Sequence, residues 1–243
     1  MIIGSILIIC DGVVNAKDLE LAEPEMLLND DASLATYSMQ DKYDSSGNAR
    51  DLKTENDFTE IGMPVVADSA HGADTGIIET DEMTFAICIN MNKPTVSGRI
   101  FSNLSPGIAP FSGIQLRIEP NGALILQVAT GDVNNGQTGT ISVTSVEHGG
   151  AVGGWTRFTV TVSNTEASIT RSGGERRATP IAKRSKSTRP LILNGAPSPE
   201  QNMGLPGTWG CFAVYDRVLT AEEQADKRDK IKTIMSLRGE FVN

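Results

Sequence analysis

Apolar and polar residues alternate in many short segments of this chain, and turn-forming residues separate the segments. In TFAICINM (84–91), the side chains of Phe85, Ile87 and Ile89 fall on one face of an extended chain. A period of two residues predicts a β-strand. The same pattern predicts strands over 34–39, 98–103, 141–146, 155–162 and 191–193, and a hairpin over 113–129 with the turn EPNG.

The segment from Thr208 to Lys232 combines a strand, a short turn and a helix. Apolar residues occupy both faces of 211–218, as in a strand that is covered on both sides. Thr220 followed three residues later by Glu223 forms a capping box, so we expect a helix over 221–236. Basic residues follow toward the end of this helix, where its dipole favours positive charge: Lys227, Arg228, Lys230 and Lys232.

Strands separated by turns, with one helix after them, predict an all-β antiparallel sandwich. A chain of 243 residues fits one large sandwich. We expect an N-terminal arm or first strand at 1–30, the sandwich at 31–219, and a C-terminal helix with its tail at 220–243. The apolar start MIIGSILIIC lacks a basic residue and is too short to span a membrane, so we interpret it as the arm or first strand.

Charge is distributed unevenly along the chain. The formal net charge is -9, and acidic residues dominate the first part, whereas 171–189 is strongly basic. Overall acidity argues against nucleic acid as the main partner. We interpret the basic segment as a solvated loop, with contact to an acidic face of a neighbouring subunit as the alternative.

The three cysteines, Cys10, Cys88 and Cys211, are far apart in the sequence. Their spacing does not match a zinc site. Cys88 and Cys211 lie in apolar strands, where a free cysteine behaves as a small hydrophobic residue. We expect free thiols and synthesis in a reducing compartment, with a Cys88–Cys211 disulfide as the alternative.

Four blocks, in this order, resemble laminin-G-like (concanavalin A-like) jelly-roll domains. They are DSSGN (44–48), TFAICINM (84–91), GWTRFTVTVSN (154–164) and TWGCFAVYDRVLTAEE (208–223). The last block resembles the family ending DVRIYNRALSxEEI, and the resemblance covers roughly 33–225. Ala49 stands where the family usually has glycine, and the usual tryptophan of the second block is missing. The resemblance implies a jelly roll and, for most members, sugar binding or a structural role as an appendage.

Few residues are candidates for catalysis. Glycosidases of this superfamily carry several acidic residues on one strand face, whereas here Glu79 and Asp81 share a face and Glu82 points the other way. The histidines, His71 and His148, lie in glycine-rich segments, and we interpret both as loop residues. We therefore expect that the protein is not an enzyme.

Sugar binding usually requires an exposed aromatic ring beside hydrogen-bonding side chains. Trp155 and Trp209 lie in predicted strands and are expected in the core, so Tyr43 and Phe111 are the better exposed aromatic candidates. The predicted ligand-binding residues are Tyr43, Phe111, Asp132 and Asn134.

Calcium is the one cofactor that the resemblance suggests, because many concanavalin A-like domains bind it near the loop rim. The candidate ligands are Asp44 and Asn48, and the turn at 132–136 also carries suitable oxygens. Turn formation by these Asp and Asn residues is the favoured alternative. No cofactor is required by any motif in the chain.

The resulting expectation is a non-catalytic structural or adhesion protein. In the first hypothesis it is an exposed virion component, such as a phage tail, fibre or capsid decoration, made in the host cytoplasm and assembled with other subunits or with itself through 1–30. In the second hypothesis it is a secreted, lectin-like carbohydrate-binding module that contacts a surface glycan. Neither hypothesis includes a membrane span.

Overall fold

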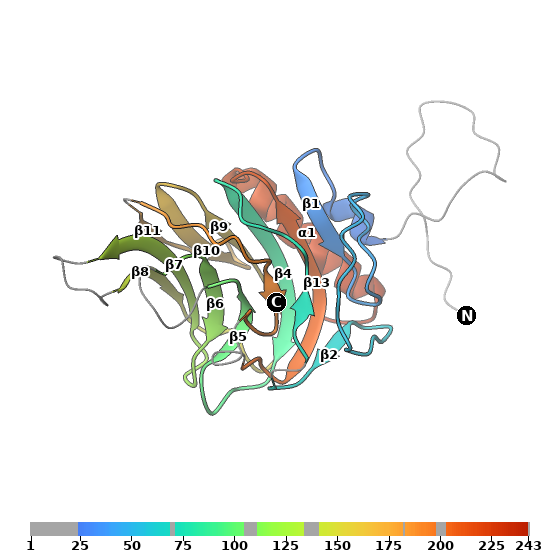
Figure 1. Ribbon diagram of the computed structural model, residues 1–243. Helices are drawn as coiled ribbons and strands as arrows, with labels where there is room; N and C mark the ends of the chain where they lie inside the picture. The colour runs from blue at the N-terminus through green and yellow to red at the C-terminus, as the bar shows by residue number, and fades with distance from the viewer. Residues whose placement is uncertain are drawn as a thin grey trace, which may run out of the picture.

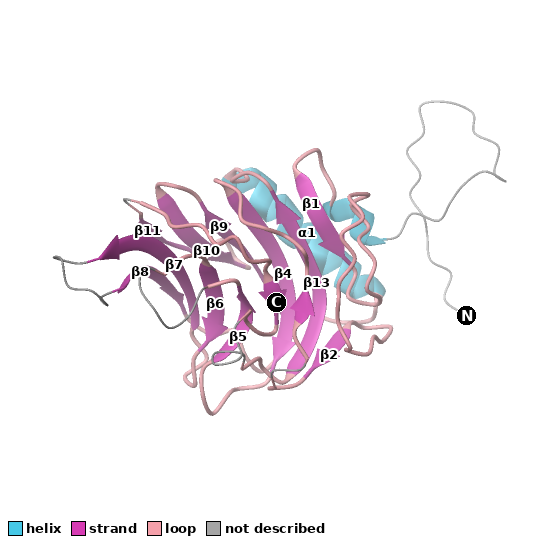
Figure 2. Ribbon diagram, viewed as in Figure 1, coloured by secondary structure: helices cyan, strands magenta, loops and turns pink. Residues whose placement is uncertain are grey.

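The computed structural model describes residues 24–68, 71–104, 111–133, 141–181, 183–197 and 203–242. Within these residues, two antiparallel sheets face each other and helix α1 (Ala221–Leu237) lies outside them (Figures 1 and 2). The predicted all-β sandwich with a C-terminal helix is therefore confirmed.

The larger sheet, in the described part of the chain, has seven strands in the order β1-β13-β4-β9-β10-β11, with β2 also paired to β13. Every pairing in it is antiparallel, and β4 runs between β13 and β9 along nearly its whole length. Its strands are β1 (Ser33–Tyr37), β2 (Met63–Val65), β4 (Met83–Met91), β9 (Thr156–Val162), β10 (Glu166–Arg171), β11 (Arg176–Pro180) and β13 (Gly207–Tyr215).

The smaller sheet has six described strands in the order β3-β12-β5-β6-β7-β8. Strands β6 and β7 form the predicted hairpin, and Gly122 in its turn has φ +85, a conformation that glycine adopts without strain. The strands are β3 (Ala73–Asp74), β5 (Gly98–Ser102), β6 (Ile114–Ile118), β7 (Leu124–Val133), β8 (Ile141–His148) and β12 (Ile192–Leu193).

The main core fills the space between the two sheets. Phe85 of the larger sheet and Phe101 of the smaller sheet meet with ring centroids 4.9 Å apart. Trp209 and Phe212 of β13 pack edge-to-face at 5.5 Å in the same core. Burying aromatic side chains of this size contributes about 1.5–3 kcal/mol each, so this contact between the sheets is a major source of stability.

A second apolar cluster lies on the opposite face of the larger sheet, beneath α1. Cys211, Ala213 and Tyr215 of β13 face this cluster, while Trp209 and Phe212 face the main core. The prediction that this strand is covered on both faces is thus confirmed. Trp155 also packs under the helix and is 8% exposed, so both tryptophans are buried as expected.

Helix α1 begins with the predicted capping box. The Thr220 hydroxyl accepts a bond from the backbone N–H of Glu223, and the Glu223 carboxylate accepts one from the Thr220 N–H. The prediction that basic side chains stabilise the C-terminal end of the helix dipole was wrong, because the last turn of α1 holds no basic residue. Lys227 instead turns toward the sheet side, where it donates to the Leu28 carbonyl and pairs with Asp30 at 2.8 Å.

The two described cysteines are free thiols, as expected. Cys88 and Cys211 are direct neighbours across β4 and β13. Burial raises the pKa of the Cys88 thiol well above its ordinary value, and contact with Cys211 raises it further. Both therefore act as small apolar side chains beneath α1, while Cys10 lies outside the described residues.

The stretch between residues 24 and 30 is attached to the body of the fold. The short 3-10 helix η1 (Pro24–Leu28) packs on α1, and Leu28 is fully buried. Tyr215 donates its hydroxyl to the Leu28 carbonyl at 2.7 Å. Residues 1–23 lie outside the described residues, so the arm or first strand expected at 1–30 stays a prediction. Among the described residues, no helix has the length and apolar character needed to cross a membrane.

Candidate ligand-binding site

The loop that follows β1 folds back along the free edge of that strand. One carboxylate holds the turn: Asp44 accepts backbone N–H bonds from Thr36 and Ser46 at 2.9 Å and from Arg50 at 3.1 Å. The Asn48 amide donates to the carbonyl of Ser33 at 2.8 Å. These bonds satisfy polar groups at the strand edge and fix the loop at 38–52 as part of the scaffold.

The turn also explains the departure from the family pattern at Ala49. This residue has φ 55, in the left-handed region that glycine adopts most readily. Gly47, two residues earlier, has φ +86 and meets no neighbouring atom. Both residues thus hold left-handed backbone conformations in this turn, and Ala49 does so with a side chain where the resemblance leads to the expectation of glycine.

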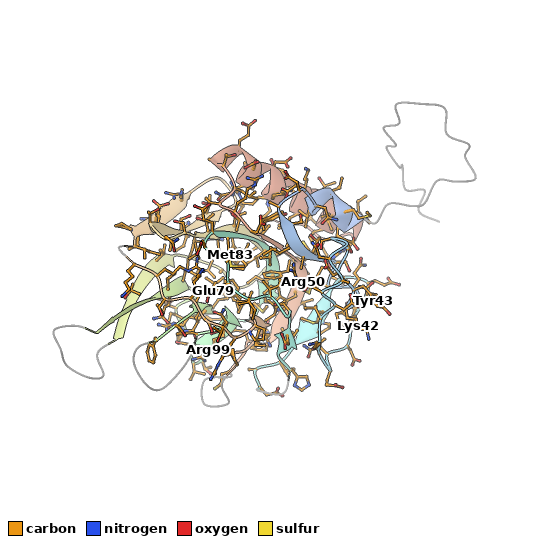
Figure 3. The ribbon with its side chains drawn as sticks, turned by 45° about the horizontal axis from the view of Figure 1, so that its top comes forward. Lys42, Tyr43, Arg50, Glu79, Met83 and Arg99 are labelled. Atoms are coloured by element: carbon orange, nitrogen blue, oxygen red, sulfur yellow. The ribbon has the colours of Figure 1, made fainter. Side chains whose placement is uncertain are left out.

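A cavity of about 420 Å³ opens between this loop and β3. The two sides are joined where Lys53 and Asp74 exchange backbone hydrogen bonds at 2.9 and 3.0 Å. Figure 3 shows that Lys42 and Tyr43 lie close together at the edge of the fold, with Arg50 nearer its centre. Lys42 and residues 49–53 line the cavity on one side, and two residues that follow β3 line it on the other. The lining residues are Lys42, Ala49, Arg50, Asp51, Leu52, Lys53, Thr75 and Gly76.

Tyr43 is an exposed aromatic residue that directly follows Lys42, a lining residue of this cavity, and is not itself part of the lining. Its side chain is 59% exposed, and the ammonium group of Lys42 lies 5.8 Å from the ring centroid. An aromatic ring of this kind presents an apolar face with a polar hydroxyl at one end. The expectation that Tyr43 is an exposed aromatic residue is confirmed.

The polar side chains of the cavity are held in position by the backbone around them. The Arg50 guanidinium donates to the Leu34 carbonyl at 2.5 Å, and the Arg50 carbonyl accepts the hydroxyl of Tyr37 at 2.6 Å. Burial raises the pKa of Tyr37, and the charge of Asp44 raises it further, so this phenol stays protonated and donates. A pre-organised site of this kind loses little conformational freedom when a ligand binds.

The other predicted ligand-binding residues lie elsewhere. Phe111 is half-buried in the segment between β5 and β6, and is less exposed than expected. Asp132 belongs to β7, which is four strands away from β3 in the smaller sheet. Asn134 lies outside the described residues. The structure therefore does not bring Phe111 or Asp132 together with Tyr43.

Asp44 and Asn48 do not offer the ligands that calcium requires. Calcium takes six to eight oxygen ligands, whereas the Asp44 carboxylate already accepts three backbone N–H bonds and the Asn48 side chain supplies at most one oxygen, its amide nitrogen being the donor to Ser33. In the described part of the chain, no three His, Cys, Asp or Glu side chains form a metal site. Calcium binding stays a prediction without a ligand set among these residues.

The acidic residues near position 80 form a structural cluster with the basic segment. Glu79 and Arg184 make an ion pair whose side chains are 1% and 0% exposed, and Glu79 also accepts the backbone N–H of Ser187 at 3.1 Å. Lys186 pairs with Asp81 at 2.5 Å, and its hydrogen bond lowers the pKa of that carboxyl group. Glu79 is therefore fully engaged and is not available as a catalytic acid or base.

The structure corrects the interpretation of 171–189 as a loop throughout. Part of the segment is strand β11, which pairs with β10. Its positive charges meet acidic residues of the same chain: Arg176 pairs with Glu166, and Arg177 pairs with Glu175 at 2.6 Å. These arginines are therefore paired with acidic residues of their own chain, and contact of the segment with a neighbouring subunit stays a prediction.

The histidines occupy two different environments. His71 is exposed in a loop, as expected, and lies 2.5 Å from Asp68. His148 was expected in a loop, but it ends β8, is 4% exposed and lies within 3.3 Å of the Glu175 carbonyl. Neither histidine lines the cavity beside Tyr43.

The outer face of the smaller sheet carries a second polar surface. Arg99 donates to Gln115 at 2.8 Å, Gln115 donates to Gln127 at 2.9 Å, and Arg117 donates to Gln127 at 2.8 Å. Arg117 also pairs with Glu119 at 2.5 Å. The hydrogen-bonding groups of this row are largely used among themselves, and Figure 3 places Arg99 well away from Tyr43.

Comparison with known proteins finds one matching family and several solved structures with a similar fold. The sequence model of the concanavalin A-like lectin/glucanases superfamily (Laminin_G_3) matches residues 67–223. No curated protein matches the chain in sequence.

Three solved structures illustrate the structural similarity. The receptor-binding domain of botulinum neurotoxin D has a TM-score of 0.59 and 12% identity, covering 82% of this chain and 52% of that one. The binding domain of botulinum neurotoxin DC in complex with SialylT has a TM-score of 0.62 and 11% identity, covering 83% and 52%. Domain 4 of AbnA, a GH43 extracellular arabinanase from Geobacillus stearothermophilus, in complex with arabinotriose, has a TM-score of 0.57 and 16% identity, covering 81% and 98%. The chain thus spans about half the length of the neurotoxin domains, and at these identities the similarity shows the fold alone.

Proposed function

Because the chain belongs to the concanavalin A-like lectin/glucanases superfamily, we propose that it is a non-catalytic carbohydrate-binding domain that takes a sugar in the cavity beside Tyr43. The observation that carries this proposal is a cavity of about 420 Å³ whose walls are held by hydrogen bonds and whose lining residue Lys42 is followed directly by the exposed ring of Tyr43. That volume falls in the range of about 300–1,000 Å³ that is typical of small-ligand sites.

The chemistry of the lining suits a sugar. The ring of Tyr43 can stack on the apolar face of a pyranose or furanose, because stacking requires only an exposed aromatic face. The hydroxyl of Thr75, the carboxylate of Asp51 and the ammonium group of Lys53 supply both acceptors and donors for sugar hydroxyls. Several directional bonds around one apolar contact give selectivity as well as affinity.

The similar folds support the same conclusion without establishing it. One of them was solved in complex with arabinotriose and another in complex with SialylT. In the segment where an acid set was sought, Glu79 is buried against Arg184 and is not free to act on a glycan. Hydrolysis of a glycosidic bond requires two available carboxyl groups on either side of the bond.

A glycan array with neutral and acidic sugars, followed by calorimetry on the best ligand, tests this proposal. We expect Tyr43→Ala to weaken binding about tenfold, which corresponds to about 1.4 kcal/mol. Phe241→Ala is the matched control, because Phe241 is an aromatic side chain that is 91% exposed and belongs to the C-terminal tail rather than to the loop that contributes Lys42 to the cavity. Equal binding by the Tyr43→Ala variant, or turnover of the glycan by the purified protein, would refute the proposal.

A role in a virion, assembled through the N-terminal segment, remains a separate prediction. The base of that segment is anchored, since Lys227 donates to the Leu28 carbonyl and pairs with Asp30. A variant without residues 1–23 keeps these contacts, so it should fold normally. If the intact protein forms oligomers or joins particles and the shortened protein does so equally well, the predicted assembly role of the arm is wrong.

A further inference from the structure

A cavity of about 480 Å³ lies between the first half of α1 and the strands β10 and β11. It is distant from Tyr43, because β11 and β1 form opposite edges of the larger sheet (Figure 1). Thr170 and Arg176 form its floor, and Gln224 and Arg228 of α1 form one wall. The site proposed for sugars uses none of these residues.

Arg228 is a buried cation that makes no direct ion pair within the described residues. It is 6% exposed, and within the described part of the chain its guanidinium makes one hydrogen bond, from Nη1 to the hydroxyl of Thr159 at 2.8 Å. Burial lowers the pKa of Arg228 and the neighbouring Arg157 lowers it further, although the charge of nearby Asp229 raises it. A buried guanidinium without an anion is unfavourable, so an anion that reaches Arg228 would be bound strongly.

Thr170 adds an unused hydroxyl to the same place. The residue is 6% exposed, and its Oγ1 atom is buried without a hydrogen-bond partner. In the sheet it lies between Thr159 of β9 and Arg176 of β11. Buried hydroxyl groups in folded proteins nearly always have a partner, so an unpaired one that lines a cavity points to a ligand atom.

Arg176 and the apolar residues of the cavity indicate which chemical groups a ligand must carry. The guanidinium of Arg176 binds Glu166 through Nη2 and has further N–H groups to donate. The wall next to these polar groups is apolar and includes Leu219, Ala221 and Ala225. A ligand that fits both parts has an anionic end and an apolar body.

We propose that this cavity binds a small organic carboxylate. Its carboxylate accepts bonds from Arg228, Arg176 and the Thr170 hydroxyl, and its apolar body lies against Leu219 and Ala225. Arginine suits this role because its planar fork matches both oxygens of a carboxylate. This inference is independent of sugar binding.

Calorimetric titration of the full chain with benzoate, at constant ionic strength, tests the proposal. Benzyl alcohol has the ring without the charge, and acetate has the charge without the ring. We expect both to bind at least about tenfold more weakly than benzoate, because each lacks one of the two contacts. Absence of benzoate binding, or equal binding of acetate and benzoate, would overturn the proposal.

Variants locate the ligand in this cavity. Thr170→Val keeps the shape of the side chain and should weaken benzoate binding about tenfold, since a hydrogen bond to a charged group is lost. Arg176→Gln should also weaken binding, whereas Arg177→Gln should not, because the side chain of Arg177 points to the opposite face of β11 and pairs with Glu175. Equal losses in the two arginine variants would show a general effect of charge and contradict the site.

One further variant separates this site from the sugar site. Tyr43→Ala should leave benzoate binding unchanged, because Tyr43 belongs to the opposite edge of the sheet. If Tyr43→Ala removes benzoate binding, the carboxylate occupies the other cavity and the proposal is wrong. Failure of the sugar-binding experiment alone has no bearing on this result.

Discussion

Replacing Glu79 by Gln should remove a large part of the stability of the protein. The side chains of Glu79 and Arg184 are 1% and 0% exposed, and Arg184 also donates to the Asp81 carbonyl at 3.0 Å. Glu79→Gln leaves the guanidinium buried without a carboxylate, which costs about 3–5 kcal/mol. For a chain of 243 residues this loss lowers the melting temperature by roughly 6–20 °C.

Urea denaturation followed by far-ultraviolet circular dichroism measures the free energy of unfolding. Lys186→Gln is the control, because the side chains of Lys186 and Asp81 are 40% and 70% exposed and a surface pair contributes at most about 1 kcal/mol. The double variant Glu79→Leu with Arg184→Leu should be less destabilised than Glu79→Gln, since no unpaired charge remains. If Glu79→Gln costs no more than Lys186→Gln, the reasoning about the buried pair is refuted.

Three smaller predictions use the same measurements. Thr220→Ala should lower the free energy of unfolding by about 1 kcal/mol, because the helix loses its cap. The pKa of Glu223 is lowered from 4.5 to about 2, chiefly by the hydrogen bond from Arg217. The stability that the ionised Glu223 contributes is therefore fully present above pH 4.5 and is lost as the pH falls toward 2. Glu223→Gln should flatten the curve of unfolding free energy against pH between pH 4.5 and pH 2. Excess calcium should not raise the melting temperature more than magnesium does, because backbone N–H groups already occupy the Asp44 carboxylate; a calcium-specific rise would contradict this.

The alternating pattern predicted buried strands such as β4 and β13, but it missed β10, whose four central residues are buried. In β4 the two faces differ in what covers them, and both sets of side chains are apolar: large residues such as Phe85 meet the opposite sheet, and small ones such as Ala86 and Cys88 meet α1. This size difference is what a helix packed close to a sheet requires. The capping box predicted the helix start because its chemistry is local.

Strand β11 could not be predicted from the pattern, for a physical reason. It forms an edge of the larger sheet, and most of its side chains are exposed, so no burial requirement acts on its sequence. Charged residues on an edge strand also prevent pairing with other chains. The residues Arg176 and Arg177 therefore give a signal in the sequence that is the same as that of a basic loop.

The candidate sugar site could be predicted only in part. The turn residues around Tyr43 indicate that this ring lies in an exposed loop. The cavity itself depends on a pairing between Lys53 and Asp74, and on Thr75 and Gly76, which follow β3 in the other sheet. Contacts of this kind leave no periodic signal, because the backbone makes them and almost any side chain is compatible with them.

The two cavities should act independently because of their positions in the sheet. Five strand pairings separate β1 from β11 in the larger sheet, and at a spacing of about 4.8 Å they amount to roughly 24 Å. Sites separated by more than about 7–10 Å and without shared partners usually contribute additively. The interior strands between them are packed on one face by the main core and on the other by α1, so neither site can shift the other without disturbing both layers. A double variant of Tyr43 and Thr170 should therefore lose sugar and carboxylate binding by the same factors as the two single variants.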